Sequence, residues 1–220
     1  RGLPEDYDWW AKIGNKEWSF QEVLPFFRKA ETDLDFRNDF HGSKGPIPVR
    51  RYRPEDLLDY QAAFYDASLS KGFPQDPDMN LPKSGGVGFW PLNQIDGVRI
   101  STAVAYIDPV RYRTNLSIEP NVVARRILID RGRATGVEVE REGGTFSIDC
   151  ERVILAAGAI ASPKLLMLSG FGPKGLLSRL GIPVICDLPG VGQNLRDHPL
   201  TVLLFEGRGP RLSEHVPVLQ

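Results

Sequence analysis

The 220-residue sequence lacks the features that mark several common classes of protein. It has 27 basic and 28 acidic residues, so no charge surplus would attract nucleic acid or an anionic membrane surface. Its longest apolar run, residues 153–161, is about half of what a membrane-spanning helix needs, and the N-terminus lacks the layout of a signal peptide. We therefore expect a soluble, cytoplasmic protein that binds no nucleic acid and has no transmembrane segment.

Cysteine is scarce as well. The two cysteines, Cys150 and Cys186, do not form a CxxC pair and have no histidine close by in the sequence. This spacing supports neither a disulfide framework nor a zinc site. We expect reduced, buried thiols and no metal.

A GxGxxG motif, the phosphate-binding loop of dinucleotide-binding folds, is also missing. Gly190-Val191-Gly192 is a poor substitute because no strand and long helix flank it. The sequence begins at Arg1 rather than at methionine and ends just after a strand-like run. We interpret it as an interior part of a longer protein, with part of the functional machinery outside it.

The first half of the sequence predicts helices and a long loop. Ser19 is placed to cap a helix that runs through Lys29, and the apolar spacing after Arg53 predicts a second helix through Lys71. Residues 72–98 contain too many prolines and glycines for a regular element, yet Phe89 and Trp90 argue against simple disorder. These two aromatic residues are candidates for lining a cofactor or substrate cavity, and packing is an equally good explanation.

The second half alternates apolar and polar residues, with Gly-containing turns at 131–133 and 142–144, and so predicts an antiparallel β-meander. It is followed by a consecutively apolar segment, which predicts a strand covered on both faces of a parallel sheet. The expected elements are strands at 116–120, 126–130, 136–140, 145–148 and 153–155, a helix beginning at Ser162-Pro163, a short helix ending near Leu180, and a strand at 184–186.

Small residues follow the apolar strand directly. Ala156, Ala157 and Gly158 would let a nucleotide touch the main chain at the carboxyl end of a parallel sheet, where ligands of such folds bind. The start of the next helix would offer free amides to anionic groups. The alternative is that these small residues merely pack against a neighbouring helix, and the pattern alone does not decide between the two.

Two longer stretches carry a resemblance to a known family. Residues 158–173, GAIASPKLLMLSGFGP, resemble the second signature of the glucose–methanol–choline (GMC) family of FAD-dependent oxidoreductases. Residues 188–199, LPGVGQNLRDHP, are similar to the family segment that follows that signature. Shorter stretches agree in the same order, so that the resemblance covers essentially the whole chain; they include residues 1–10, 18–27, 41–46 and 99–106.

The resemblance implies an α/β fold with mixed α+β elements. It implies part of a Rossmann-like FAD-binding domain over residues 1–198, with lid and loop segments in 1–100 and the β-meander in 115–150. Residues 199–220 would begin a substrate-binding domain. In the family, the positions of Ala156, Ala157 and Gly158 contact the adenosine half of FAD, and the main chain at Ala124, or at Val122 or Val123 beside it, meets the adenine.

The resemblance also implies a reaction. Family members oxidise the CH–OH group of an alcohol, as choline and alcohol dehydrogenases do, by hydride transfer to the flavin, which a second electron acceptor reoxidises. The family's catalytic histidine lies beyond this sequence, so we assign no catalytic residue and expect the isolated chain to be inactive and to bind FAD weakly or not at all. The alternative is a non-catalytic binding or regulatory module that has kept a GMC-like fold.

Other conspicuous residues favour structural roles. We expect His41, in a glycine-rich turn, to be a solvated or hydrogen-bonding loop residue rather than a base, and His198 to belong to a polar scaffold with Asn194 and Asp197. His215 carries no prediction. The arginines of residues 50–53 predict a solvated face. The remaining aromatic group predicts core packing rather than a stacking platform for nucleic acid, and comprises Trp9, Trp10, Trp18, Phe20, Phe26 and Phe27.

Overall fold

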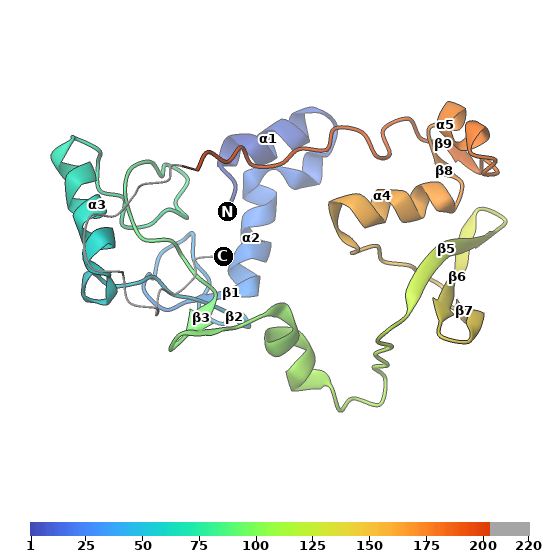
Figure 1. The fold of residues 1–220 in the computed structure, drawn as a ribbon, viewed down its shortest axis with the longest axis horizontal. Coiled ribbons are helices and arrows are strands. Elements are labelled where there is room, and N and C mark those ends of the chain that lie inside the picture. The colour runs from blue at the N-terminus through green and yellow to red at the C-terminus, as the bar shows by residue number, and fades with distance from the viewer. Residues whose placement is uncertain (203–220) are drawn as a thin grey trace. The chain divides into compact units, whose positions relative to one another are not determined.

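The computed structural model of the protein describes residues 1–202 (Figure 1). The chain divides into two compact units, Arg1–Ser117 and Ile118 onward, and each contains helices and strands, as the predicted α/β class requires. The predicted boundary between two domains at residue 198 stays a prediction, and most of the segment 199–220 lies outside the described residues. The first unit holds α1 (Pro4–Lys12), α2 (Phe20–Ala30), β1 (Glu31–Asp33), β2 (Ile47–Val49), α3 (Asp59–Ser70), β3 (Gln94–Ile95) and β4 (Val98–Arg99).

Helix α2 begins where the sequence predicts. The Oγ atom of Ser19 accepts a hydrogen bond from the N–H of Glu22, which satisfies one of the amides that a helix start leaves free. The chain then passes directly into β1, which pairs in parallel with β2, Glu31 facing Ile47 and Asp33 facing Val49. This short parallel pair brings the segments around residues 31–35 and 47–51 together.

Helix α3 is shorter than the prediction of residues 53–71. The carboxylate of Asp56 accepts a hydrogen bond from the N–H of Arg53 and closes a separate 3₁₀ turn, Pro54–Asp56. The chain is extended again at Leu58, whose N–H donates to the side chain of Gln61 and starts the helix at Asp59. Local side-chain hydrogen bonds therefore place the first helical turn later than the apolar spacing does.

The aromatic group near the N-terminus packs mostly with itself. The ring of Trp10 makes edge-to-face contacts with Tyr7 and with Trp18, at centroid distances of 5.6 and 5.8 Å. Phe20 is buried, as expected for core packing, but the prediction is wrong for the tryptophans, which stay about half exposed, and for Phe26, which is 70% exposed. The contacts of the tryptophan rings with their aromatic neighbours leave part of each ring open to solvent.

The predicted meander is confirmed for its last three strands, whereas the alternating residues 116–120 form no strand. Strands β5 (Val123–Asp130), β6 (Arg133–Arg141) and β7 (Gly144–Asp149) form an antiparallel sheet in that order. Arg131 and Gly132, at the turn between β5 and β6, have φ angles of 47° and 77°, the left-handed pair that tight hairpin turns require. The carboxylate of Glu138 pairs with Arg126 across the same two strands and raises the pKa of that guanidinium.

The predicted strand at 153–155 is not formed. The segment is irregular, and the side chain of Ile154 is 83% exposed. A buried strand needs a hydrogen-bonding neighbour, and none of the strands between residues 1 and 202 pairs with this segment. Beyond it follow α4 (Gly158–Leu168), β8 (Phe171–Gly172), α5 (Lys174–Arg179) and β9 (Cys186–Asp187), which pairs in parallel with β8.

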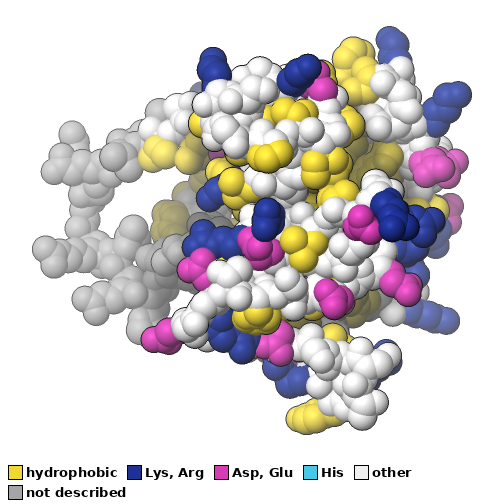
Figure 2. Space-filling view, turned by 90° about the vertical axis from the view of Figure 1, so that its right-hand side faces the viewer, with side chains coloured by type: hydrophobic (Ala, Val, Ile, Leu, Met, Phe, Trp, Pro, Cys, Tyr) yellow, Lys and Arg dark blue, Asp and Glu magenta, His cyan; other side chains and the backbone are white. Residues whose placement is uncertain are grey.

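The core of the second unit is small. Ile127 and Val139 from the sheet, Leu165 from α4 and Leu177 from α5 are buried. Figure 2 shows hydrophobic side chains at several places on the visible surface, between patches of basic and acidic residues. The cysteines are free, as predicted, but Cys186 is exposed and Cys150 is only partly covered, because β9 and the end of β7 have no further layer over them in the described structure.

Candidate functional site

The predicted cofactor-binding residues Ala156, Ala157 and Gly158 lie at the start of α4 and are all exposed. Gly158 has a φ angle of 84°, in the left-handed region that favours glycine, and a Cβ atom built on it would meet nothing within 4 Å. No neighbouring side chain of the described structure therefore fills the space beside Gly158. The segment has the open backbone that a flat or anionic group would need.

The sequence predicted that the helix begins at Ser162, but α4 starts four residues earlier, at Gly158. The Oγ atom of Ser162 accepts a hydrogen bond from the backbone N–H of Ala157, at a distance of 3.0 Å. The amides that remain available are those of the first turn of α4, and no acidic side chain in that turn offsets the positive end of the helix dipole.

Ala124 lies in β5, opposite Val139 and next to an irregularity in the register at Arg126, and it is exposed. Strand β5 is joined to helix α4 at Ile127, not at Ala124. The N–H of Ile127 donates to the Oγ atom of Ser169 at 2.8 Å, and that hydroxyl donates to the carbonyl of Leu165 at 2.6 Å. The fold thus joins β5 to the C-terminal end of α4, whereas Ala156–Gly158 lies at its N-terminal end.

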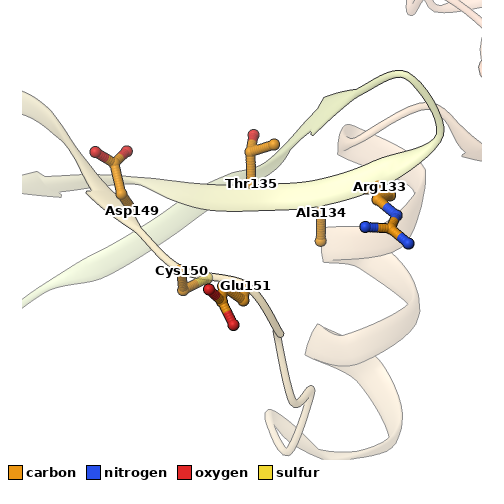
Figure 3. Close-up of a pocket in the computed structure, with 6 residues that line it drawn as sticks. All are labelled: Arg133, Ala134, Thr135, Asp149, Cys150 and Glu151. Atoms are coloured by element: carbon orange, nitrogen blue, oxygen red, sulfur yellow. The ribbon is translucent and has the colours of Figure 1, made fainter.

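An open cavity of about 890 Å³ lies in the same unit, where β6 begins and β7 ends (Figure 3). In Figure 3, Ala134, Cys150 and Glu151 point to one side of the strand, and Thr135 and Asp149 point to the other. None of the four predicted cofactor residues lines this cavity. Its lining residues are Arg133, Ala134, Thr135, Asp149, Cys150 and Glu151.

A second cavity, of about 290 Å³, lies in the first unit. Phe89 lines it, as the sequence suggested, and its ring stacks on Tyr65 at a centroid distance of 5.1 Å. Trp90 does not line this cavity and is 63% exposed. The other walls of the cavity are formed by Asp35, Phe36, Arg51, Tyr52, Arg53, Pro54, Gln75, Asp76 and Pro77.

Beside this cavity lies a buried cluster of charged residues, which we call the charged cluster: Glu31, Asp33, His41, Arg51 and Asp78. The guanidinium of Arg51 donates two hydrogen bonds to Asp33, at 3.0 and 3.1 Å, and one to Asp78 at 2.7 Å. The ring of His41 lies between the same carboxylates and that of Glu31. The charged cluster holds together segments that are far apart in the sequence.

The charged cluster confirms one expectation and corrects another. His41 was expected to be a solvated or a hydrogen-bonding loop residue, and it is the latter, because it is only 4% exposed and hydrogen-bonds to Glu31. The prediction of a solvated face is wrong for Arg51, because its side chain is buried against Asp33 and Asp78. These two partners are 18 and 27 residues away along the chain. Pairing at such separations leaves no periodic pattern in the sequence.

The environment of Asp33 changes the pKa of its carboxyl group. Burial acts to raise the pKa, but the hydrogen bonds that Asp33 accepts from the N–H groups of Phe36 and Asp35 and from Arg51 outweigh burial. The pKa of Asp33 is therefore lowered, and the carboxylate is the stable form in the folded protein.

The remaining histidines do not form a site in the described structure. The side chain of His198 is fully exposed, and the backbone N–H of His198 donates to Asp197 Oδ1 at 2.7 Å. Asn194 is exposed nearby with a φ angle of 57°. His215 lies outside the described residues. The expected scaffold of these polar residues stays a prediction.

Comparison with known proteins places the chain in a family. The profile of the GMC oxidoreductases matches residues 1–200. The chain belongs to the GMC oxidoreductase family. It is 42% identical to an uncharacterized GMC-type oxidoreductase of Rhodococcus erythropolis, with 100% of the chain and 44% of that relative covered. It is 41% identical to the human mitochondrial choline dehydrogenase, with 90% and 33% covered.

Solved structures agree with this membership of the GMC family. Pyridoxine 4-oxidase from Mesorbium loti superposes with a TM-score of 0.80 at 32% identity, over 86% of this chain and 37% of that enzyme. An FAD-dependent oxidoreductase from Chaetomium thermophilum superposes with a TM-score of 0.78, over 86% and 35%. The chain thus spans less than half the length of these GMC relatives. In residues 1–202 no helix is both long enough and apolar enough to cross a membrane.

Proposed function

We propose that this GMC chain is part of an FAD-dependent oxidoreductase that oxidises the CH–OH group of a small alcohol. Family membership over residues 1–200 supports the proposal, as do relatives named choline dehydrogenase and pyridoxine 4-oxidase. The observation that carries it in this chain is the uncovered main chain at Ala156–Gly158. A choline-like alcohol is one candidate substrate, with a separate electron acceptor as the second partner.

The residues present suit the adenosine half of FAD. Ala156, Ala157 and Gly158 present main chain without bulky side chains, and the first turn of α4 adds amides at a positive helix end. The main chain at Ala124 would meet the adenine. Bound FAD would supply the hydride acceptor, and the protein would supply binding and orientation.

The proton chemistry needs groups that this chain does not provide. Oxidation of an alcohol to a carbonyl removes a hydride from carbon and a proton from oxygen, and a base must take that proton. Neither the buried His41 nor the exposed His198 is assigned this role. We place the base in the part of the GMC protein that this chain does not span, and we expect the isolated chain to show no turnover.

The experiment compares two substitutions in a GMC protein of full family length that contains this chain. Ala157→Leu adds an apolar side chain beside the proposed adenosine site. Ser178→Leu adds a similar side chain at an exposed position of α5 and is the matched control. We expect Ala157→Leu to weaken FAD binding at least about tenfold, roughly 1.4 kcal/mol, and the control to leave it unchanged. Flavin absorbance after desalting measures retention of the cofactor.

The same preparation separates the two functional hypotheses. An enzyme retains flavin and reduces an artificial electron acceptor when alcohols are added. A binding or regulatory module that kept only the GMC fold would stay colourless or would not reduce the acceptor. Equal flavin retention by both leucine variants would overturn the assignment of the site but not that of the enzyme.

A further inference from the structure

The ring of His41 makes close contacts at both of its nitrogens. Nδ1 lies 3.0 Å from Glu31 Oε1 and 3.0 Å from Asp33 Oδ2, and Nε2 lies 2.8 Å from Asp78 Oδ2. The His41 side chain is completely buried, and so is that of Asp33. These are hydrogen-bond distances between nitrogen and oxygen, so a hydrogen must lie in the contact on each side of the ring.

A neutral imidazole carries only one N–H and an ionised carboxylate carries none. Two contacts on opposite sides of the ring therefore require one proton more than a neutral His41 with three ionised carboxylates can supply. A ring protonated on both nitrogens donates to Glu31 from Nδ1 and to Asp78 from Nε2, and its positive charge also lies beside the carboxylate of Asp33. All the carboxylates can then stay ionised.

The charge balance points the same way. Glu31, Asp33 and Asp78 bring three negative charges into the buried space, while the guanidinium groups that contact them, Arg1 and Arg51, bring two positive charges. Burial of an unpaired charge is costly, so a third cation is needed. The imidazolium of His41 supplies it. Asp35, which contacts Arg51 but not the ring, is partly exposed and solvated.

A metal ion is the other cation that Glu31, Asp33 and His41 could hold, because their ligand atoms lie close together. However, the oxygen atoms are already used. Glu31 Oε1 accepts hydrogen bonds from Arg1 and from the N–H of Gly42, and Asp33 Oδ2 accepts one from Arg51. A divalent ion would displace these donors and lie next to two guanidinium groups. A proton on the ring requires no such change.

We propose that His41 is an internal cation of this protein, protonated on both ring nitrogens, which ties the β1 segment to the loop that contains Asp78. The ring of Phe36 lies against this cation and against the guanidinium of Arg51, at centroid distances of 6.2 and 4.6 Å. An aromatic face next to two cations is the arrangement that a cation–π interaction favours.

The hydrogen bond between His41 and Asp78 supports the part of the first unit's cavity wall that is formed by Asp76, Pro77 and Phe89. Asp78 belongs to a tightly closed loop, in which Asp76 accepts a hydrogen bond from the N–H of Gly85 at 2.8 Å. A Cβ atom on Gly88 would lie 1.8 Å from the carbonyl oxygen of Asp76, so the two sides of the loop touch. Phe89, the residue after Gly88, lines the cavity. Loss of the ring proton would remove the donor to Asp78 and loosen this wall.

Nitrogen-15 NMR of the histidine rings in the 220-residue chain tests the proposal at about pH 8, above the value near 6.5 at which free imidazole titrates. Spectra of His198→Asn and His215→Asn assign the three rings. We expect His41 to show a proton on both nitrogens. A neutral His41 with one N–H would overturn the proposal, and so would a metal-dependent shift of its signals on titration with Zn²⁺.

Two variants test whether the carboxylate of Asp78 keeps the ring of His41 protonated. Asp78→Asn replaces the carboxylate by an amide that can donate to Nε2, so we expect His41 to become neutral at the same pH. Asp35→Asn is the matched control, because Asp35 contacts Arg51 but not the ring, and His41 should stay doubly protonated. A doubly protonated His41 in Asp78→Asn would overturn the tie to Asp78. If that variant does not fold, the spectrum of the unchanged protein decides alone.

Discussion

At the scale of single residues, the charged cluster determines how the first unit responds to acid. Asp33 is completely buried, accepts hydrogen bonds from two backbone N–H groups and pairs with Arg51. Its lowered pKa means that the folded protein binds this proton less readily than the unfolded chain. The contribution of Asp33 to stability is therefore present above the ordinary carboxyl value of about 3.9, and it is lost as the pH falls further toward the folded value.

This relation predicts the behaviour of Asp33→Asn. The substitution leaves Arg51 and His41 short of one negative charge, so the free energy of unfolding near neutral pH should fall by about 3 kcal/mol. The loss of stability below about pH 4 should also become less steep, because one titrating group is gone. Urea denaturation between about pH 3 and 7 measures both effects, with the exposed Asp39→Asn as control. An unchanged acid slope in Asp33→Asn would contradict the role of this carboxylate.

The sequence predicted some single residues well and missed others for a physical reason. Ser19 was found as a helix cap because its hydrogen bond to Glu22 spans three residues. The bonds of His41 to Asp78 and of Arg51 to Asp33 join residues 37 and 18 positions apart, and only the folded chain brings them together. The one local sign was a histidine in a glycine-rich turn, where Gly42 lies against the backbone of Arg28.

At the scale of elements, local rules predicted the three strands of the meander but failed at the segments before and after them, residues 116–120 and 153–155. Alternation and glycine turns specify β5, β6 and β7 without reference to the rest of the protein. The segment 153–155 has the composition of a buried strand but no partner in the described structure, and its pairing depends on residues elsewhere. The sequence also offered no sign of the hydrogen bond that joins β5 to the end of α4.

That hydrogen bond gives a prediction for the second unit. Ser169 is buried, and Ser169→Ala would leave the buried N–H of Ile127 without its acceptor. We expect the free energy of unfolding to fall by about 1–3 kcal/mol, because an unsatisfied buried donor loses its hydration without compensation. Ser178→Ala, at an exposed position of α5, should change it by less than about 0.5 kcal/mol. Equal stabilities of the two variants in urea would show that this contact does not join β5 to α4.

At the scale of the whole molecule, the chain matches the GMC oxidoreductase family over residues 1–200 and spans less than half the length of its relatives. Within residues 1–202 the two units have few buried apolar residues, and many large apolar side chains stay exposed, including Ile154 and Ile160 beside the proposed adenosine site. Exposed apolar surfaces of this kind are typical contact sites for further protein segments. The proposed flavin site would then depend on those segments for its remaining walls.

Hydrogen exchange tests this dependence directly. In the isolated 220-residue chain, we expect the amides of residues 153–155 to exchange almost as fast as in an unfolded peptide, because no strand of the described structure pairs with them. In a GMC protein of full family length, the same amides should be protected by at least about a hundredfold, since a paired strand opens only by local unfolding. The amides of β6, which is paired on both sides, serve as the internal control and should be protected in both proteins. Fast exchange of residues 153–155 in the longer protein would mean that these apolar residues are not a sheet strand, and the adenosine site proposed at the end of that strand would lose its structural basis.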